Sequence, residues 1–178
     1  MADASYTGGS TLDGGDFSSY SGGAYEDGGG FDWGEQTALE RMRDFVTRYG
    51  DERINSLTID YTDQVPSSAG LFPGGLVELS RTKDIMGHVS VESQYNFALY
   101  TVLEKSPEDD AGATDNAEWQ MRFQEWVQEQ SAMGLAPSFG DEPRKERMVA
   151  QNGELYSADE EGTALYVIQM SVSFTKNY

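Results

Sequence analysis

The stretch that decides the fold is GHVSVESQYNFALYTVL, residues 87–103, in which apolar and polar residues alternate almost without a break. The apolar set occupies odd positions and comprises Val89, Val91, Tyr95, Phe97, Leu99 and Leu103. Successive side chains of a strand point to opposite faces of its sheet, so this pattern buries one face and leaves the other in water. It predicts one long strand in an antiparallel sheet that is covered on one face.

Shorter patterns on either side predict further strands. Residues 163–176 alternate in the same way, and 54–62 and 76–81 are expected to form shorter strands. The segment 64–75 contains Pro73 and the pair Gly74–Gly75, which predicts a long loop. Asn152–Gly153 is typical of a tight hairpin and predicts a turn between strands at 148–151 and 154–157. A second turn is expected at 160–162.

Two amphipathic helices are predicted. Thr37 with Glu40 forms a capping box ahead of the first, which is expected to end at Gly50. Asp115 with Glu118 is predicted to cap the second, which Gly134 should end. The apolar face of the second helix comprises Trp119, Phe123, Trp126, Val127 and Met133, and its polar face comprises Gln120, Glu125, Gln128 and Glu129.

The order of these elements lacks the regular strand–helix alternation of a doubly wound sheet. We therefore predict an α+β domain over residues 37–178, with a largely antiparallel sheet and two amphipathic helices packed on one face. Residues 1–36 form an acidic N-terminal arm with ten glycines and no Lys or Arg. Such a composition favours a solvated tail, but its aromatic residues would also suit an arm that docks on a neighbouring subunit. The candidate docking residues are Tyr20, Tyr25, Phe31 and Trp33.

Composition restricts the partners. The chain has 178 residues, 12 Lys and Arg against 31 Asp and Glu, and a net charge of −19, which repels nucleic acids and anionic membranes. It has no cysteine, and it shows neither a secretion signal nor an apolar run long enough to span a membrane. The expectation is a soluble protein without disulfides or thiolate metal sites.

Motifs for catalysis are weak. His88 is the sole histidine and lies on the polar side of the long strand, away from any nucleophile motif. Asp109, Asp110 and Asp115 allow a Ca²⁺ site, although a solvated acidic loop explains them as well. Trp119 and Trp126 allow a sugar-binding surface, although their helical spacing equally suits a core. No enzyme activity, cofactor or metal is expected.

Two pairs of residues point to contacts with other chains. Leu71 and Phe72 are large apolar residues in the expected loop, and either the domain's own core or an adjacent subunit would cover them. Arg81 and Lys83 are cations in an acidic protein and are candidates for ion pairs between subunits.

Several segments together resemble a family of phage tail terminators, whose members are often labelled minor capsid proteins. The segments are SAGLFPGGLVELSR at 68–81, NFALYTVL at 96–103, Trp119, FQEWVQEQS at 123–131, GLAPSFGD at 134–141 and SADEEGT at 157–163. The resemblance covers about 37–176 and leaves the arm outside it.

The resemblance implies a structural virion protein, assembled in the host cytoplasm, that forms a homo-oligomeric ring of six subunits at the head-proximal end of a tail tube. Its partners would be the tail tube protein and a neck or head-completion protein, with DNA at most passing through the lumen. An acidic lumen or rim would repel that DNA, and the candidate residues are Glu108, Asp109, Asp110, Asp159, Glu160 and Glu161. Three alternatives stay open: another neck protein, a monomeric adaptor, and a metal- or carbohydrate-dependent enzyme.

Overall fold

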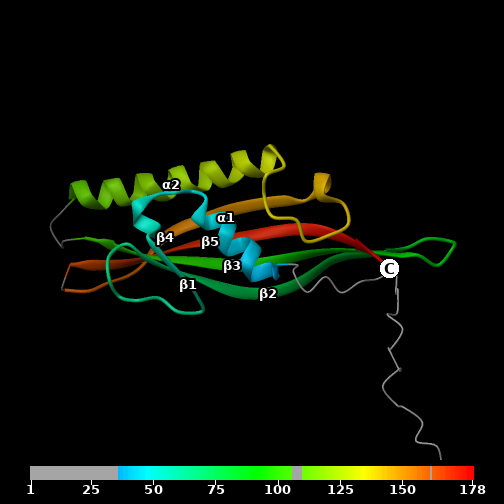
Figure 1. Ribbon diagram of the computed structural model, residues 1–178, viewed down its shortest axis with the longest axis horizontal. Helices are drawn as coiled ribbons and strands as arrows, with labels where there is room; N and C mark the ends of the chain where they lie inside the picture. Colours follow the sequence, from blue (N-terminus) through cyan, green and yellow to red (C-terminus); the bar gives the residue numbers. More distant parts are fainter. Residues whose placement is uncertain (1–35, 106–109, 161) are drawn as a thin grey trace, which may run out of the picture. The chain divides into compact units, whose positions relative to one another are not determined.

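The computed structural model describes residues 36–105, 110–160 and 162–178. These residues form a mixed α+β fold with a five-stranded sheet and two α-helices (Figure 1), which confirms the predicted fold class. The elements in chain order are α1 (Ala38–Thr47), β1 (Ser56–Ile59), β2 (Ser68–Lys83), β3 (Val89–Glu104), α2 (Asp110–Ala132), β4 (Arg147–Ala158) and β5 (Thr163–Asn177). The arm at 1–36 lies outside the described residues, apart from Gln36.

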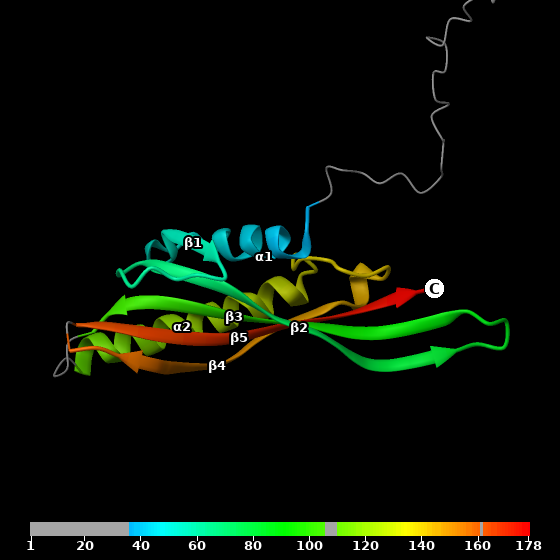
Figure 2. The ribbon, with the colours of Figure 1, turned by 90° about the horizontal axis from the view of Figure 1, so that it is seen from below.

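The sheet has the strand order β1-β2-β3-β5-β4 (Figure 2). β1 runs parallel to β2 over a short stretch, and the other neighbouring pairs are antiparallel. Leu71, Leu99 and Ile168 are register partners across β2, β3 and β5, so they share one face. The long strand expected at 87–103 is β3, and the closing strand expected at 163–176 is β5.

One face of the sheet forms the core with both helices. Met42, Phe45 and Val46 of α1 are fully buried, as are Trp119, Phe123 and Val127 of α2, and all of them join the sheet residues in one cluster. The ring centroids of Phe45 and Trp126 are 4.8 Å apart, and those of Tyr49 and Phe123 are 5.1 Å apart. The helices are therefore held to each other as well as to the sheet.

The start of α1 is the capping box that the sequence predicts. The Thr37 hydroxyl accepts a hydrogen bond from the Glu40 backbone N–H at 3.3 Å, and the Glu40 carboxylate accepts one from the Thr37 N–H at 2.7 Å. Hydrogen bonds to the Glu40 carboxylate from the Thr37 N–H and then from the Thr37 hydroxyl lower the pKa of Glu40. The capping box also satisfies backbone donors that a helix start otherwise leaves open.

The prediction of a loop at 64–75 and a short strand at 76–81 is wrong, because β2 runs unbroken from Ser68 to Lys83. β1 pairs with β2 only as far as Leu71. Pro73 therefore lies where the outer edge of β2 has no paired strand among the described residues. Proline is tolerated at such an edge because it has no N–H to donate. A register shift at Pro73/Gly75 then accommodates the glycines, and Gly75 has a φ of +95°.

The hairpin predicted at Asn152–Gly153 is also wrong. β4 continues through these residues, and the register against β5 shifts between Gln151 and Glu154. Asn152 has a φ of +54°, a conformation that suits a bulge as well as a tight turn. The hairpin turn of this region instead joins β4 to β5.

The second helix begins at Asp110, five residues before the predicted cap at Asp115. Gln120 is only 4% exposed, although it was assigned to the polar face, whereas Met133 of the apolar face is 54% exposed. A Cβ on Gly153 would meet the side chains of Gln120 and Gln124, so the β4 bulge passes directly beneath these two glutamines. The bulge thus explains why a polar residue of α2 is buried.

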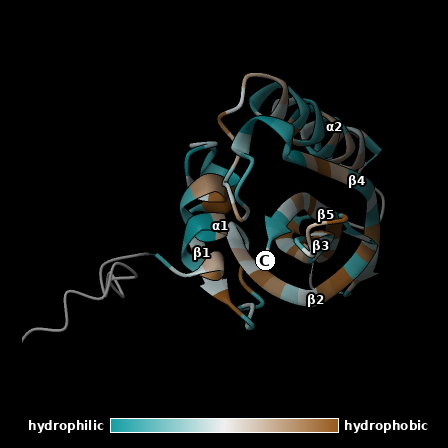
Figure 3. Cartoon of the chain, turned by 90° about the vertical axis from the view of Figure 1, so that its right-hand side faces the viewer, coloured by the Kyte–Doolittle hydropathy of each residue, from teal (hydrophilic) through white to brown (hydrophobic). Residues whose placement is uncertain are grey.

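Hydrophobic and hydrophilic residues are mixed along β2, where bands of both kinds follow each other (Figure 3).

Within the described residues, no helix is long and apolar enough to cross a membrane.

Candidate functional site

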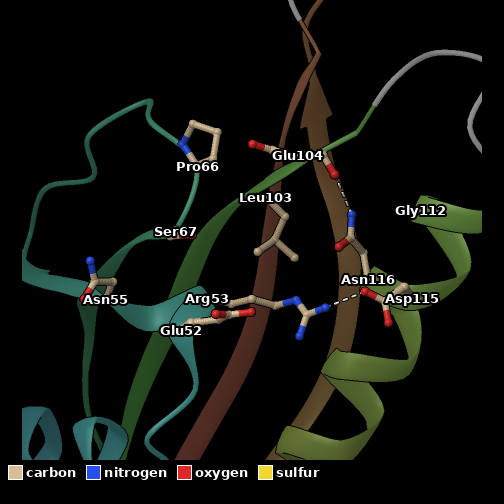
Figure 4. A pocket seen from close by; sticks show the side chains of 10 residues that line it. All are labelled: Glu52, Arg53, Asn55, Pro66, Ser67, Leu103, Glu104, Gly112, Asp115 and Asn116. Carbon is tan, nitrogen blue, oxygen red and sulfur yellow. Dashed lines mark hydrogen bonds and ion pairs between the residues drawn. The ribbon is translucent and has the colours of Figure 1, made fainter.

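A polar cleft of about 640 Å³ lies at one end of the sheet, between α2 and the segment that precedes β1 (Figure 4). Its walls come from the 3₁₀ helix Glu52–Ile54, the end of β3 and the first turns of α2. The lining residues are Glu52, Arg53, Asn55, Pro66, Ser67, Leu103, Glu104, Gly112, Asp115 and Asn116.

Arg53 is the single cation among the described residues that line this cleft, and it is paired with carboxylates. Arg53 forms an ion pair with Asp115 of α2, and a longer one of 3.7 Å with Asp51. The Asn116 side chain donates a hydrogen bond of 3.0 Å to the backbone carbonyl of Glu104. Both interactions fasten the start of α2, one to the segment before β1 and the other to β3. Both interactions therefore stabilise the position of α2 relative to the sheet.

The Ca²⁺ site that the sequence allowed as an alternative is not assembled by the described residues. Asp115 is engaged with Arg53, Asp110 is exposed at the helix start, and Asp109 lies outside the described residues. No group of three or more His, Asp and Glu side chains is placed to hold a metal ion in the described part of the chain. The tryptophans of the sugar-binding alternative belong to the core, with Trp119 fully buried and Trp126 packed on Phe45.

Four residues were candidates for contacts with other subunits, and the structure places them in different environments. Leu71 is fully buried in the domain's own core, so its side chain is not available to a neighbour. Phe72 is half-buried on the opposite face, 5.1 Å from Tyr100 between ring centroids. Arg81 and Lys83 are exposed near the far end of β2, where Arg81 is bonded to Glu78 at 2.7 Å.

Three of the six acidic residues proposed for a lumen or rim are described, and the bounds of α2 and β4 place all three at the same end of the sheet. Asp110, Asp159 and Glu160 are exposed at the end of the sheet where the β4–β5 turn and the start of α2 meet. The backbone N–H of Lys105 donates to the Gly162 carbonyl at 2.8 Å, which joins the two connections. Glu108, Asp109 and Glu161 lie outside the described residues, as do the arm residues Tyr20, Tyr25, Phe31 and Trp33.

The turn between β2 and β3 holds the single histidine and two exposed apolar side chains. The Asp84 carboxylate accepts hydrogen bonds from the backbone N–H groups of Met86 (2.8 Å) and His88 (2.9 Å), and it contacts His88 Nδ1 at 2.9 Å. The His88 side-chain hydrogen bond is the main cause that lowers the pKa of Asp84. Ile85 is fully exposed and Met86 is 78% exposed. His88 was predicted to lie on the long strand, whereas β3 begins only at Val89 and His88 belongs to the turn. The apolar tip was missed, and the pair Ile85–Met86 ahead of Gly87 was the available signal.

A second feature missed from the sequence is an aromatic cluster on the sheet face opposite the helices. Phe72 and Tyr100 contact edge to face, and the rings of Tyr100 and Tyr156 do so at 5.5 Å between centroids. With Tyr61 and Leu165 they line a hollow of about 340 Å³. These residues come from separate strands and from the segment after β1, so only the fold brings them together.

Comparison with known proteins gives no assignment: no protein-family model matches the chain, and no curated protein matches it.

Proposed function

We propose that the chain is a tail terminator, a structural protein whose copies close into a ring on the head-proximal end of a phage tail tube or a related tail-like tube. In this role the ring stops polymerisation of the tube and offers the surface to which a neck or head-completion protein joins. The proposal starts from the resemblance of the segments between 68 and 163. Six copies per ring is the number that the resemblance implies.

The observation that carries the proposal is the free outer edge of β2. β1 pairs with β2 only at Ser68–Leu71, and the rest of that edge has no strand partner among the described residues. Leu76, Val77 and Leu79 on this stretch are 56%, 47% and 48% exposed. A long edge with unpaired backbone groups and exposed apolar side chains is a site where another chain adds. A surface built for contact with other chains supports assembly as the function.

Charge supports the same role. In a ring through which DNA passes, an acidic wall repels the phosphates and keeps the DNA from adhering. Asp110, Asp159 and Glu160 gather at one end of the sheet, and we assign them to the lumen or rim of the proposed ring. A structure of the ring with these carboxylates on its outer wall would overturn this assignment.

The test is electron microscopy of tails assembled with and without this gene, with tail length as the readout. Loss of a terminator should replace tails of uniform length by overlong tubes without heads, and a plasmid copy of the gene should restore the uniform length. Tails of normal length that fail to join heads would reassign the chain to the neck. Particles that are unchanged would overturn a role in the virion.

A further inference from the structure

The β2–β3 turn, residues Asp84–His88, presents a rigid apolar tip. Ile85 and Met86 extend from a turn that the Asp84 side chain closes with its hydrogen bonds to the backbone of Met86 and His88. The Asp84 N–H also donates to the His88 carbonyl at 3.0 Å, and Gly87 takes a φ of +98° that completes the turn. Because the backbone of the tip is already ordered, burying its two side chains costs little backbone entropy.

The aromatic hollow lies on the uncovered sheet face and is lined by Tyr61, Phe72, Tyr100, Tyr156 and Leu165. Its rim is accessible, since Tyr61 is 59% and Tyr156 is 63% exposed. A second hollow of about 320 Å³ shares Thr62 and Leu165 with it and extends it towards Asp159. The Thr62 hydroxyl oxygen is buried with no hydrogen-bond partner among the described atoms. The surface that the hollow offers to an occupant is therefore its exposed aromatic rim.

The region around the tip carries charges of both signs, whereas the hollow is acidic. Arg81 and Lys176 are both register partners of Val91, so they flank β3 just behind the tip, and Lys83 is the last residue of β2 before it. Asp60 and Asp159 line the two parts of the hollow. Glu78, Asp84 and Glu92 lie beside the three cations near the tip, and Glu78 pairs with Arg81. In a chain of net charge −19, this balanced region is repelled less by the acidic hollow than a surface of average charge would be.

The tip and the hollow of one copy cannot meet. Phe72 and Lys83 belong to the same strand, and at the usual rise of a strand they are about 35 Å apart. Any contact between tip and hollow therefore joins two copies, and each copy keeps one free tip and one free hollow. Repetition of such a head-to-tail contact gives a closed ring or an open filament.

We propose that Ile85 and Met86 at the tip of one copy insert into the aromatic hollow of the next copy, and that this is the subunit contact of the assembly. The contact itself does not depend on the proposed function. Only the closure of successive contacts into a ring rests on it.

The test uses the full chain with two variants, one at each side of the contact. Ile85→Asp with Met86→Asp disables the tip, and Tyr156→Asp with Tyr61→Asp disables the hollow. All four side chains are well exposed, so circular dichroism and thermal unfolding should show that both variants fold. Sedimentation velocity should find the wild-type chain as an oligomer and each variant alone as a monomer.

Mixing the two variants provides the decisive measurement. The tip variant still has a hollow and the hollow variant still has a tip, so an equimolar mixture should form a 1:1 dimer and nothing larger. A contact between two identical surfaces would not give this result. Met121→Gln, at a position of α2 that is 61% exposed, is the matched control and should assemble like the wild-type chain.

The outcomes separate this contact from the proposed function. A wild-type chain that stays monomeric, or variants that assemble like the wild type, would overturn the contact, whatever the tail-length experiment shows. Variants that lose assembly while deletion of the gene leaves tails unchanged would support the contact and overturn termination.

Discussion

Gly140 is a single residue on which the packing of the loop after α2 depends. A Cβ at this position would overlap the Thr175 carbonyl oxygen and lie 3.0 Å from the Thr175 nitrogen, and the next N–H, of Asp141, bonds that carbonyl at 2.9 Å. Gly140→Ala should push the loop off β5 and loosen Phe139 from Phe174. We expect the free energy of unfolding to fall by about 1–3 kcal/mol in urea titrations.

Gly134 is the matched control, because its role is conformational. It has a φ of +71°, and a Cβ added to it would meet no atom within 4 Å, so Gly134→Ala should cost about 1 kcal/mol and Gly134→Asn less, since asparagine accepts the left-handed region. Asparagine should give no such relief at Gly140. Equal relief at both positions would contradict the steric explanation for Gly140.

The Asp84 carboxylate predicts how the β2–β3 turn responds to acid. Its pKa is lowered, first by the His88 side-chain hydrogen bond and then by backbone hydrogen bonds. Because the folded-state pKa is the lower one, the stabilisation is present above the ordinary carboxyl pKa and is lost as the pH falls through the lowered value. In a carbon-detected NMR titration, His88→Ala should raise the pKa of Asp84 towards its ordinary value. An unchanged pKa would mean that the backbone donors alone account for the shift.

At the scale of elements, α2 stabilises the fold through one face. Phe123 is fully buried against Tyr49 and Trp126, whereas Met121 on the same helix is 61% exposed. Phe123→Ala should lower the free energy of unfolding by about 3–5 kcal/mol through lost burial and the cavity that it leaves. Met121→Ala should change it by about 0.5 kcal/mol or less. Urea unfolding of both variants tests this, and similar losses would mean that α2 is not packed as described.

The elements also show what the sequence could predict. β3 and β5 were recognisable because each buries alternate residues along its length, and α1 because its cap is local. β2 and β4 were misread because Pro73, Gly75 and Asn152–Gly153 are typical of turns, while the pairing that makes them bulges or edge positions depends on residues of other strands. The aromatic hollow was hidden for the same reason, since its rings come from separate segments.

At the scale of the whole molecule, two features oppose each other in any assembly of this chain. Copies that each carry a net charge of −19 repel one another, and the ionic strength determines the range of that repulsion. The proposed contact instead joins a tip whose neighbouring cations, Arg81 and Lys83, are balanced by Glu78 and Asp84, to a hollow that Asp60 borders. Exposed ion pairs of this kind contribute only about 0–1 kcal/mol each, so burial of the apolar tip has to supply the remaining affinity.

Self-association should therefore tighten when salt is raised from about 0.01 M to about 0.15 M, because the screening length falls from about 30 Å to about 8 Å and suppresses the long-range repulsion before the short-range contacts. Sedimentation velocity over a concentration series at each salt level measures the effect. Lys83→Glu, which adds to the repulsion and removes a cation beside the tip, should weaken association at both levels and more strongly at low salt. Tighter association of the wild-type chain at low salt would show that the close charge pairs outweigh the net charge, and the tip would then bind mainly through its cations.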